Sequence, residues 1–192
     1  MAEWKFDEGA AHSAGGSGAI LESGVYYGVF TEAKLVSTPN GARGVEFSFE
    51  ESDTGRQCRY IRVITRKNDG DKAFGYGLVN ALMGLLKLTA ISDAEIGEDS
   101  NGQPVRGLPA LCDKPVGVML QREDYWKSNG TPGWRMNVVN FIDAVTNKTF
   151  AETKDGKDAT AYKNKIVDRP APPRPGAPVG KSHEPGDDDL PF

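Results

Sequence analysis

The chain has few of the residues on which most metal and catalytic sites depend. Its 192 residues include two cysteines, Cys58 and Cys112, and two histidines, His12 and His183. The cysteines lie far apart, and neither has a His or Cys neighbour at the spacing of a zinc site. We therefore expect no bound metal and reduced thiols, as is usual for a cytoplasmic protein.

Familiar catalytic motifs are also missing. The sequence has no Gly-rich phosphate loop followed by Lys and Ser or Thr, and no His-Glu-x-x-His pair. Paired acids such as Glu50 and Glu51 fall at the end of an expected strand, where a solvated surface explains them. We expect a protein that is not an enzyme and needs no cofactor. A metal-dependent nuclease, which requires converging carboxylates, is the disfavoured alternative.

Long apolar runs and an excess of positive charge are absent as well. No stretch approaches the roughly 20 apolar residues that span a bilayer, and the first residues lack the apolar region of a signal peptide. These absences predict a soluble, cytoplasmic protein. The net charge of −4 gives no global attraction to nucleic acid, so any such binding must come from a local basic patch.

Composition divides the chain into four parts. Residues 1–19 are rich in Gly, Ala and Ser and are expected to form a flexible arm. An ordered body follows over residues 20–150, and then a charged extension over residues 151–168. Residues 169–192 begin with a Pro-rich linker, expected to be extended and semi-rigid, and end in an acidic tip.

The body shows strand periodicity with one helical interruption. Expected strands lie near residues 25–35, 45–50, 56–65, 115–125 and 134–145. Between the third and fourth, residues 72–87 carry apolar side chains at helical spacing, although Gly75, Gly77 and Gly84 weaken that helix. A second helical turn is expected at 92–95 and a surface loop at 97–107.

This element order predicts the fold class. Three strands, a helix and two strands form the order of the OB fold, a five-stranded Greek-key barrel that binds oligonucleotides on its second and third strands and flanking loops. We therefore expect a mainly β protein with an OB-type barrel, a helix between strands three and four, and a disordered C-terminal tail.

The third expected strand carries a uniform positive charge. It holds the bases Arg56, Arg59, Arg62, Arg66 and Lys67, with no acid between residues 56 and 67. Tyr60 and Arg62 alternate with the core-facing Ile61 and Val63, so they should face solvent. An aromatic ring and cations on one strand suit a single strand of nucleic acid, which is held by stacking and phosphate contacts. The alternative is an edge strand protected by charge from aggregation.

The turn between the last two strands supplies a second candidate surface. It is flanked by the aromatic and basic residues Tyr125, Trp126, Lys127, Trp134 and Arg135, with Glu123 and Asp124 diluting the charge. In an OB fold this turn flanks the binding groove, so these side chains could stack bases. The alternative for Tyr125 and Trp134 is a cross-strand aromatic pair that stabilises the hairpin.

The last six residues are Asp187, Asp188, Asp189, Leu190, Pro191 and Phe192. Burying three unpaired carboxylates would cost more free energy than burying the two bulky apolar residues beside them would return. The segment is therefore expected to project into water. A solvated acidic end is the plain interpretation of such a run, but it gives no reason for a final Leu-Pro-Phe.

This hexapeptide resembles the acidic tip of single-stranded DNA-binding proteins, a family that ends in Asp-Asp-Asp-Ile-Pro-Phe or a close variant. Leu190 in place of Ile is the departure. The body resembles the family only in element order and patch placement, and it is closer to phage-encoded members than to bacterial housekeeping ones.

The resemblance implies a protein that coats single-stranded DNA with little sequence preference during replication, recombination and repair. It also implies that the tip, residues 187–192, binds replication or repair proteins. A protein-interaction module without DNA binding and an accessory subunit of a phage nucleic-acid enzyme stay open as alternatives. Self-association also stays open.

Overall fold

The computed structural model describes residues 18–173. The tip at 187–192, both histidines and nearly all of the expected arm lie outside this range. Along the described chain the elements are β1 (Gly24–Ser37), β2 (Arg43–Glu51), β3 (Gln57–Arg66), α2 (Phe74–Leu85), β4 (Ala94–Glu98), β5 (Pro104–Gly107), a 3₁₀ turn (Pro109–Leu111), β6 (Val116–Trp126), β7 (Pro132–Ile142), α3 (Phe150–Lys154) and a 3₁₀ turn (Ala161–Lys163).

The predicted fold class is confirmed: the protein is mainly β, and a short helix follows the third strand. All described strands belong to one antiparallel sheet of seven strands. The long strand β1 organises it, since its first half pairs with β6 and its second half with β2. The outer strands β3 and β7 approach each other without forming a ladder, so the sheet is not closed.

Two sequence predictions between the helix and β6 were wrong. The second helical turn expected at 92–95 is instead the approach to β4 and its first two residues, and the loop expected at 97–107 contains most of a hairpin formed by β4 and β5. The hairpin is joined to β1 through Lys34 and Gly107. Its sequence has polar residues on both sides because β4 is exposed throughout, which removes the apolar alternation that marks a strand.

The core lies between the two halves of the sheet. Phe30 of β1 packs against Phe47 of β2, with ring centroids 4.5 Å apart, and against Phe141 of β7 at 5.9 Å. Ile61 and Val63 of β3 also face this core, and both are buried. The alternation predicted for β3 is therefore confirmed, and it turns the intervening side chains outward.

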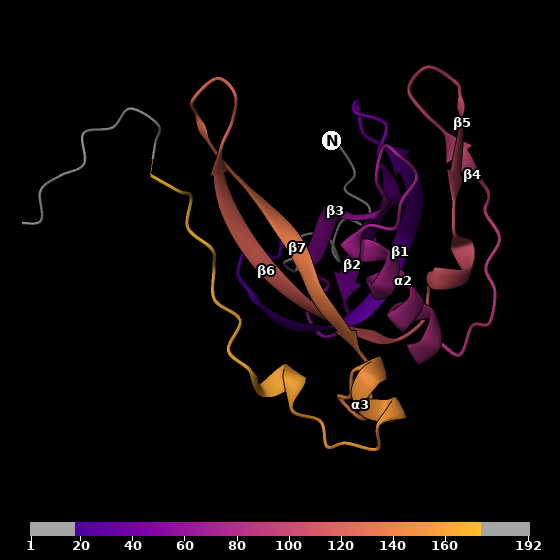
Figure 1. The fold of residues 1–192 in the computed structure, drawn as a ribbon, viewed down its shortest axis with the longest axis vertical. Helices are drawn as coiled ribbons and strands as arrows, with labels where there is room; N and C mark the ends of the chain where they lie inside the picture. Colours follow the sequence, from indigo (N-terminus) through magenta and orange to yellow (C-terminus); the bar gives the residue numbers. More distant parts are fainter. Residues whose placement is uncertain (1–17, 174–192) are drawn as a thin grey trace, which may run out of the picture.

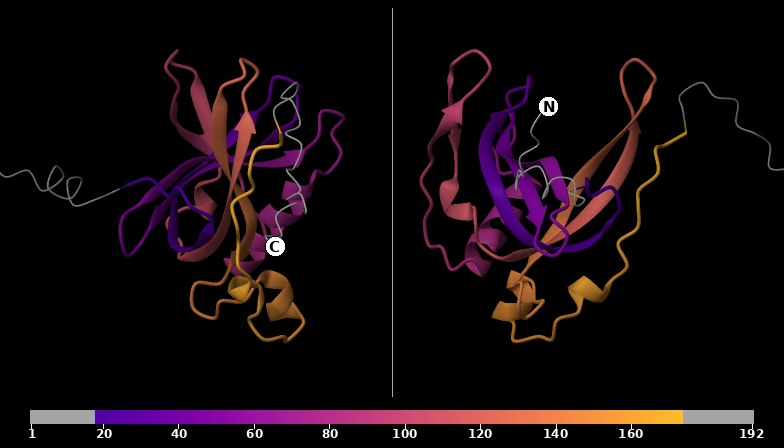
Figure 2. Two further views of the ribbon diagram at one scale, coloured as in Figure 1. Left: turned by 90° about the vertical axis from the view of Figure 1, so that its left-hand side faces the viewer. Right: turned by 180° about the vertical axis from the view of Figure 1, so that it is seen from behind.

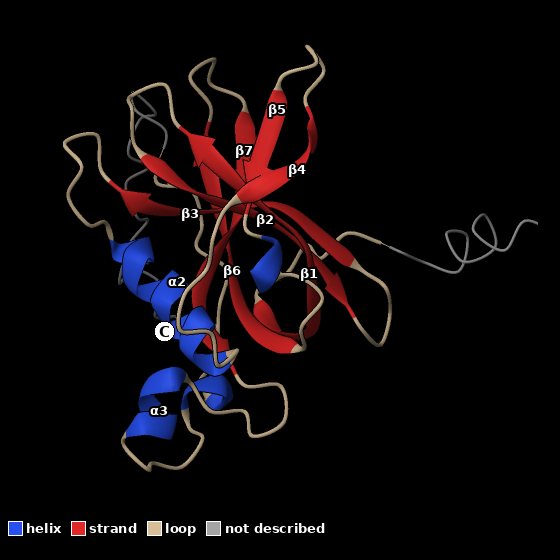
Figure 3. Ribbon diagram, turned by 90° about the vertical axis from the view of Figure 1, so that its right-hand side faces the viewer, coloured by secondary structure: helices blue, strands red, loops and turns tan. Residues whose placement is uncertain are grey.

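Glycines in α2 allow close packing at both ends of the helix. A Cβ on Gly75 would lie 2.4 Å from the carbonyl oxygen of Ile64, so the helix start sits directly against β3. A Cβ on Gly84 would meet the ring of Phe150 at 2.3 Å, which is where α3 packs. Figure 3 shows both helices at one end of the sheet, away from the hairpin tips.

The hairpins give the molecule a two-armed outline. In Figure 1 the β6–β7 hairpin rises on one side and the β4–β5 hairpin on the other, with β1, β2 and β3 between them. Residues 164–173 run back along the outside of the β6–β7 arm, as the rear view in Figure 2 makes plain. This course brings the C-terminal part of the described chain to the region where the sequence predicts binding.

Candidate nucleic-acid interface

Tyr60 is displayed by an irregularity in β3. Phe47 of β2 pairs with Ile61, but Phe49 pairs with Cys58, so Arg59 and Tyr60 together oppose Ser48 in a β-bulge. Tyr60 has a φ of 61°, in the left-handed region that glycine usually occupies at such a bulge. Its side chain is 74% exposed. The strand therefore holds a bulky aromatic ring in water at a strained position, and such strain is often found at functional sites.

Two arginines flank Tyr60 on the outer face of β3. The Arg59 guanidinium donates to the Gln57 side chain at 2.7 Å. Arg62 forms an ion pair with Glu46 of β2 at 2.5 Å, and its side chain is still 62% exposed. Both cations are thus oriented by neighbouring side chains while keeping a surface open to solvent.

The opposite wall comes from the β6–β7 hairpin. Arg135 donates to Glu123 at 2.9 Å and lies over the ring of Tyr125, 5.6 Å from its centroid. Trp134 packs against the Arg122 guanidinium at 5.3 Å and is 44% exposed. Tyr125 pairs with Gly133 across the hairpin, so within residues 18–173 the alternative of a Tyr125–Trp134 ring pair is not found.

These two walls enclose a groove of about 760 Å³, which we call the β3–β7 groove. It is lined by residues of the turn after β1, of β3, and of the β6–β7 hairpin: Thr38, Arg59, Tyr60, Arg62, Ile64, Tyr125, Trp134, Arg135, Met136 and Asn137. Three of them are arginines, three are aromatic and none is a carboxylate. Sequence positions some 70 residues apart thus meet in one site with the chemistry that stacks bases and attracts phosphates.

The remaining predicted binding residues lie outside this lining. Arg56 is held by Glu51 at 2.9 Å and lies over the ring of Tyr26, near the other end of β3. Arg66 lies over Tyr76 of α2, with Lys67 beside it at the end of the strand. Trp126 and Lys127 are at the hairpin tip, beyond the groove lining.

Trp126 is anchored by the C-terminal part of the described chain. Its indole Nε1 donates to the carbonyl oxygen of Pro172 at 2.9 Å. Further back, Arg169 exchanges backbone hydrogen bonds with the edge of β6, from its own N–H to Arg122 at 2.8 Å and from the N–H of Asp124 at 2.9 Å. We call residues 167–172 the C-terminal segment.

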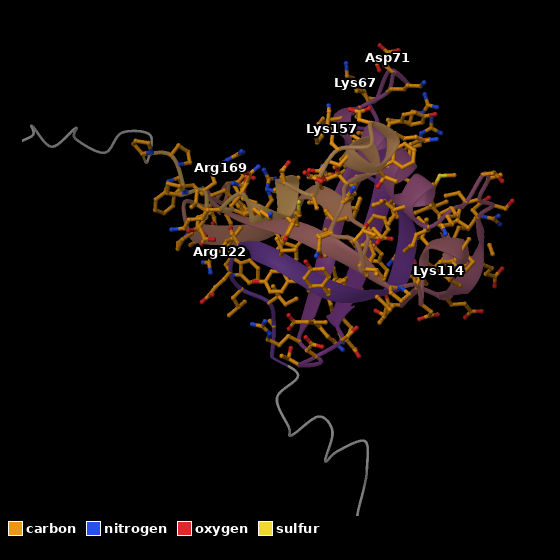
Figure 4. All side chains as sticks on the ribbon, turned by 90° about the horizontal axis from the view of Figure 1, so that it is seen from below. Lys67, Asp71, Lys114, Arg122, Lys157 and Arg169 are labelled. Atoms are coloured by element: carbon orange, nitrogen blue, oxygen red, sulfur yellow. The ribbon has the colours of Figure 1, made fainter. Side chains whose placement is uncertain are left out.

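Sequence reasoning missed this segment and the residues it brings into place. Figure 4 shows Arg169 beside Arg122, on the side of the molecule away from Lys114. The Arg169 guanidinium lies 3.6 Å from Glu123. The sequence signal was ambiguous, because a Pro-rich stretch has the same composition whether it lies along a sheet edge or extends freely.

A neighbouring recess carries the opposite charge. It has a volume of about 510 Å³ on the outer face of β1, β2 and β3, and its lining includes Glu32, Glu46 and Glu50 but only two cations, Lys34 and Arg59. Carboxylates here repel a polyanion. A single strand of nucleic acid in the β3–β7 groove would therefore be directed away from the centre of the outer sheet face. Glu46 and Glu50 were visible in the sequence as polar-face residues of the second strand, but their effect on the path was not.

The Glu123 carboxylate beside the groove is held in the ionised form. Hydrogen bonds from Arg135 and then from Asn137 lower the pKa of the Glu123 carboxyl below its usual value, and Arg169 adds to this. Glu123 therefore stays negative at neutral pH and orients Arg135 as a fixed countercharge. Arg135 is consequently positioned before any ligand arrives.

Other chemistry finds little support in the described part of the chain. Residues 18–173 contain no group of three or more His, Cys, Asp or Glu side chains that could hold a metal ion. Cys58 and Cys112 form no disulfide, and burial raises the pKa of the Cys58 thiol to about 12, which leaves it unreactive. Among the described helices, none has the length and apolar character of a membrane span.

Comparison with known proteins adds no relative: no protein-family model matches the chain, and no curated protein matches it significantly.

Proposed function

We propose that this protein binds single-stranded DNA in the β3–β7 groove, with little sequence preference. One observation carries the proposal: the groove lining combines three arginines with three aromatic side chains and contains no carboxylate. Base stacking is indifferent to base identity because every base has a π face, and it contributes roughly 1–3 kcal/mol per base. The arginines supply the phosphate contacts, so affinity falls as salt rises.

The proposed role follows from that chemistry together with the resemblance of the tip. The protein coats exposed single strands during replication, recombination and repair, in the manner of a phage-encoded, OB-type member of the family. It acts in the cytoplasm of the bacterial host cell. The tip at residues 187–192 recruits partner enzymes, which receive its acids on a basic rim and Phe192 in an apolar pocket.

The decisive experiment is a titration of the full chain with oligo(dT), followed by tryptophan fluorescence. The chain has three tryptophans, of which Trp134 lines the groove and Trp126 lies at the hairpin tip. We expect quenching that salt reverses, and the three groove arginines should contribute about 2 to the slope of log affinity against log salt, since each releases roughly 0.7 counterion from a single strand.

Two controls separate this function from its rivals. Duplex DNA of matched sequence should quench much less, because its bases are already stacked and cannot meet the groove aromatics. Tyr60→Ala should weaken binding about fivefold or more. An interaction module without DNA binding would show no quenching at low salt, and a nuclease would shorten the oligonucleotide in the presence of Mg²⁺.

A further inference from the structure

A second recess adjoins the β3–β7 groove at the helical end of the sheet. It has a volume of about 520 Å³ and lies where β3, the start of α2, β7 and the C-terminal segment meet. It shares four lining residues with the groove: Arg62, Ile64, Arg135 and Asn137. A ligand that fills the groove is therefore already at the entrance of this recess. We call it the Phe74 recess.

The ring of Phe74 is its most unusual feature. Phe74 is the first residue of α2 and is 81% exposed, although burying such a ring normally stabilises a fold. The close contact between Gly75 and the Ile64 carbonyl fixes the helix start on β3, so the backbone that carries Phe74 is held firmly. Val139 of β7 is 39% exposed and lines the same recess. Together they present an apolar platform to solvent.

The charge around this platform is positive. Arg62, Arg135 and Arg169 all line the recess, and Glu123 is its single lining carboxylate. The Glu123 side chain is only 18% exposed and already accepts from Arg135 and Asn137. The Arg169 side chain, by contrast, is 61% exposed. An apolar peptide would cover Phe74 and Val139 but would offer no negative charge to the exposed Arg169 guanidinium, whereas a nucleic acid satisfies both features.

We propose that the single strand held in the β3–β7 groove continues into the Phe74 recess, where Phe74 stacks a further base and Arg169 contacts the adjoining phosphate. This proposal rests on the proposed function and extends its site toward the helical end of the sheet. It also gives the C-terminal segment a part in binding, since the backbone bonds of Arg169 to β6 are what hold its guanidinium at the recess.

A length series of oligonucleotides tests the proposal. Fluorescence anisotropy with end-labelled oligo(dT) of about 4 and about 16 nucleotides spans the range of site sizes known for OB folds. The full chain is compared with Phe74→Ala, Phe74→Trp and Arg169→Ala. Val145→Ala is the matched control for Phe74, because Val145 is 87% exposed in the turn after β7. Lys114→Ala is the charge control for Arg169, on the other side of the molecule in Figure 4.

The proposal gives a distinct pattern of results. Phe74→Ala should weaken binding of the long oligonucleotide about fivefold or more and change the short one less than twofold. Phe74→Trp should keep the affinity for the long oligonucleotide and add quenching beyond that of the native tryptophans. Arg169→Ala should weaken the long complex and lower its salt slope by about 0.7, while both controls behave as the unchanged chain.

Other outcomes overturn the proposal, and they separate it from the proposed function. If Tyr60→Ala weakens binding but Phe74→Ala binds both lengths normally, the strand occupies the groove and does not enter the recess. Equal weakening of both lengths by Phe74→Ala would also refute the continuation, because the short oligonucleotide should not reach the ring. If the unchanged chain binds neither oligonucleotide, the proposed function and this extension fail together.

Discussion

Replacing Tyr60 by glycine should make the fold no less stable while weakening DNA binding. Most exposed aromatic residues can be truncated without a gain in stability. Tyr60 differs because its φ of 61° places it in the left-handed region, within the bulge opposite Ser48. Tyr60→Gly removes the side chain that makes this backbone conformation costly.

Three contributions set the expected change in the free energy of unfolding of Tyr60→Gly. Relief of the left-handed conformation contributes about 1–2 kcal/mol. Against this, glycine gains more backbone freedom in the unfolded chain, which costs about 0.5–1 kcal/mol. The loss of burial is small, because the ring is 74% exposed. The free energy of unfolding should therefore stay unchanged or rise by up to about 1 kcal/mol, while the lost stacking costs about 1–3 kcal/mol of binding.

Two measurements on the same samples check this prediction. Urea unfolding gives the free energy of unfolding, and anisotropy with labelled oligo(dT) gives the affinity. Tyr60→Asn is the matched control, since Asn tolerates the left-handed region but has no ring. It should resemble Tyr60→Gly in affinity. Tyr60→Phe keeps the ring and should bind like the unchanged chain.

Two results would refute the reasoning. If Tyr60→Gly lowers the free energy of unfolding by more than about 1 kcal/mol, the ring supports the fold, and the left-handed conformation would then need another explanation. Unchanged affinity in both Tyr60→Gly and Tyr60→Asn would mean that no base stacks at residue 60.

Three further predictions concern other parts of the chain. Burial alone would raise the pKa of the Glu152 carboxyl, but N–H donors of Thr149, Thr160 and Ala161 lower it to about 2, so its stabilisation is complete above about pH 4.5 and is lost as the pH falls toward 2. Glu152→Gln should lower the free energy of unfolding in urea by about 2 kcal/mol at pH 7, and it should reduce the loss of stability as the pH falls from about 4.5 toward 2. A loss of stability at acid pH as large as that of the unchanged chain would contradict this. Arg56→Ala should leave oligo(dT) affinity within twofold, because its guanidinium pairs with Glu51 away from the groove, whereas a large loss would extend the site along β3. Deleting residues 184–192 should tighten binding at low salt, because a tethered polyanion competes for the groove arginines, and unchanged or weaker affinity would exclude that competition.

The fold could be predicted where the side chains alternate clearly. Ile61 and Val63 mark the buried face of β3 by composition alone, and both lie in the core. The β4–β5 hairpin could not be found in this way, since β4 is exposed on both faces and its pairing with β5 depends on backbone bonds. Gly75 and Gly84 weaken the helix that the sequence predicts, but in the structure they are where β3 and α3 pack closely against it. Such contacts depend on residues distant in sequence.

The candidate site likewise has residues that the sequence predicts and residues that it does not. The sequence identified the charged strand and the aromatic hairpin, and Tyr60 and Trp134 do line one groove. It places Arg56 in the same group because the five bases of residues 56–67 look alike, whereas in the structure Arg56 pairs with Glu51 outside the groove lining. Composition places Arg169 in a linker, since nothing in a Pro-rich sequence indicates which sheet edge it lies along.

The balance between charge and stacking in this groove follows from how its arginines are held. Arg62 and Arg135 are each paired with a carboxylate, Glu46 and Glu123, that lies largely buried beside the groove. A phosphate arriving there is attracted by a partly neutralised cation, so it gains less than from an unpaired one. The same pairing holds each guanidinium in place, so less side-chain entropy is lost when the strand binds. Net attraction per phosphate should thus be modest, and the aromatic residues must supply a large share of the affinity. In a chain of net charge −4, the proposed binding of a polyanion therefore depends on this local groove, because the protein as a whole repels a polyanion.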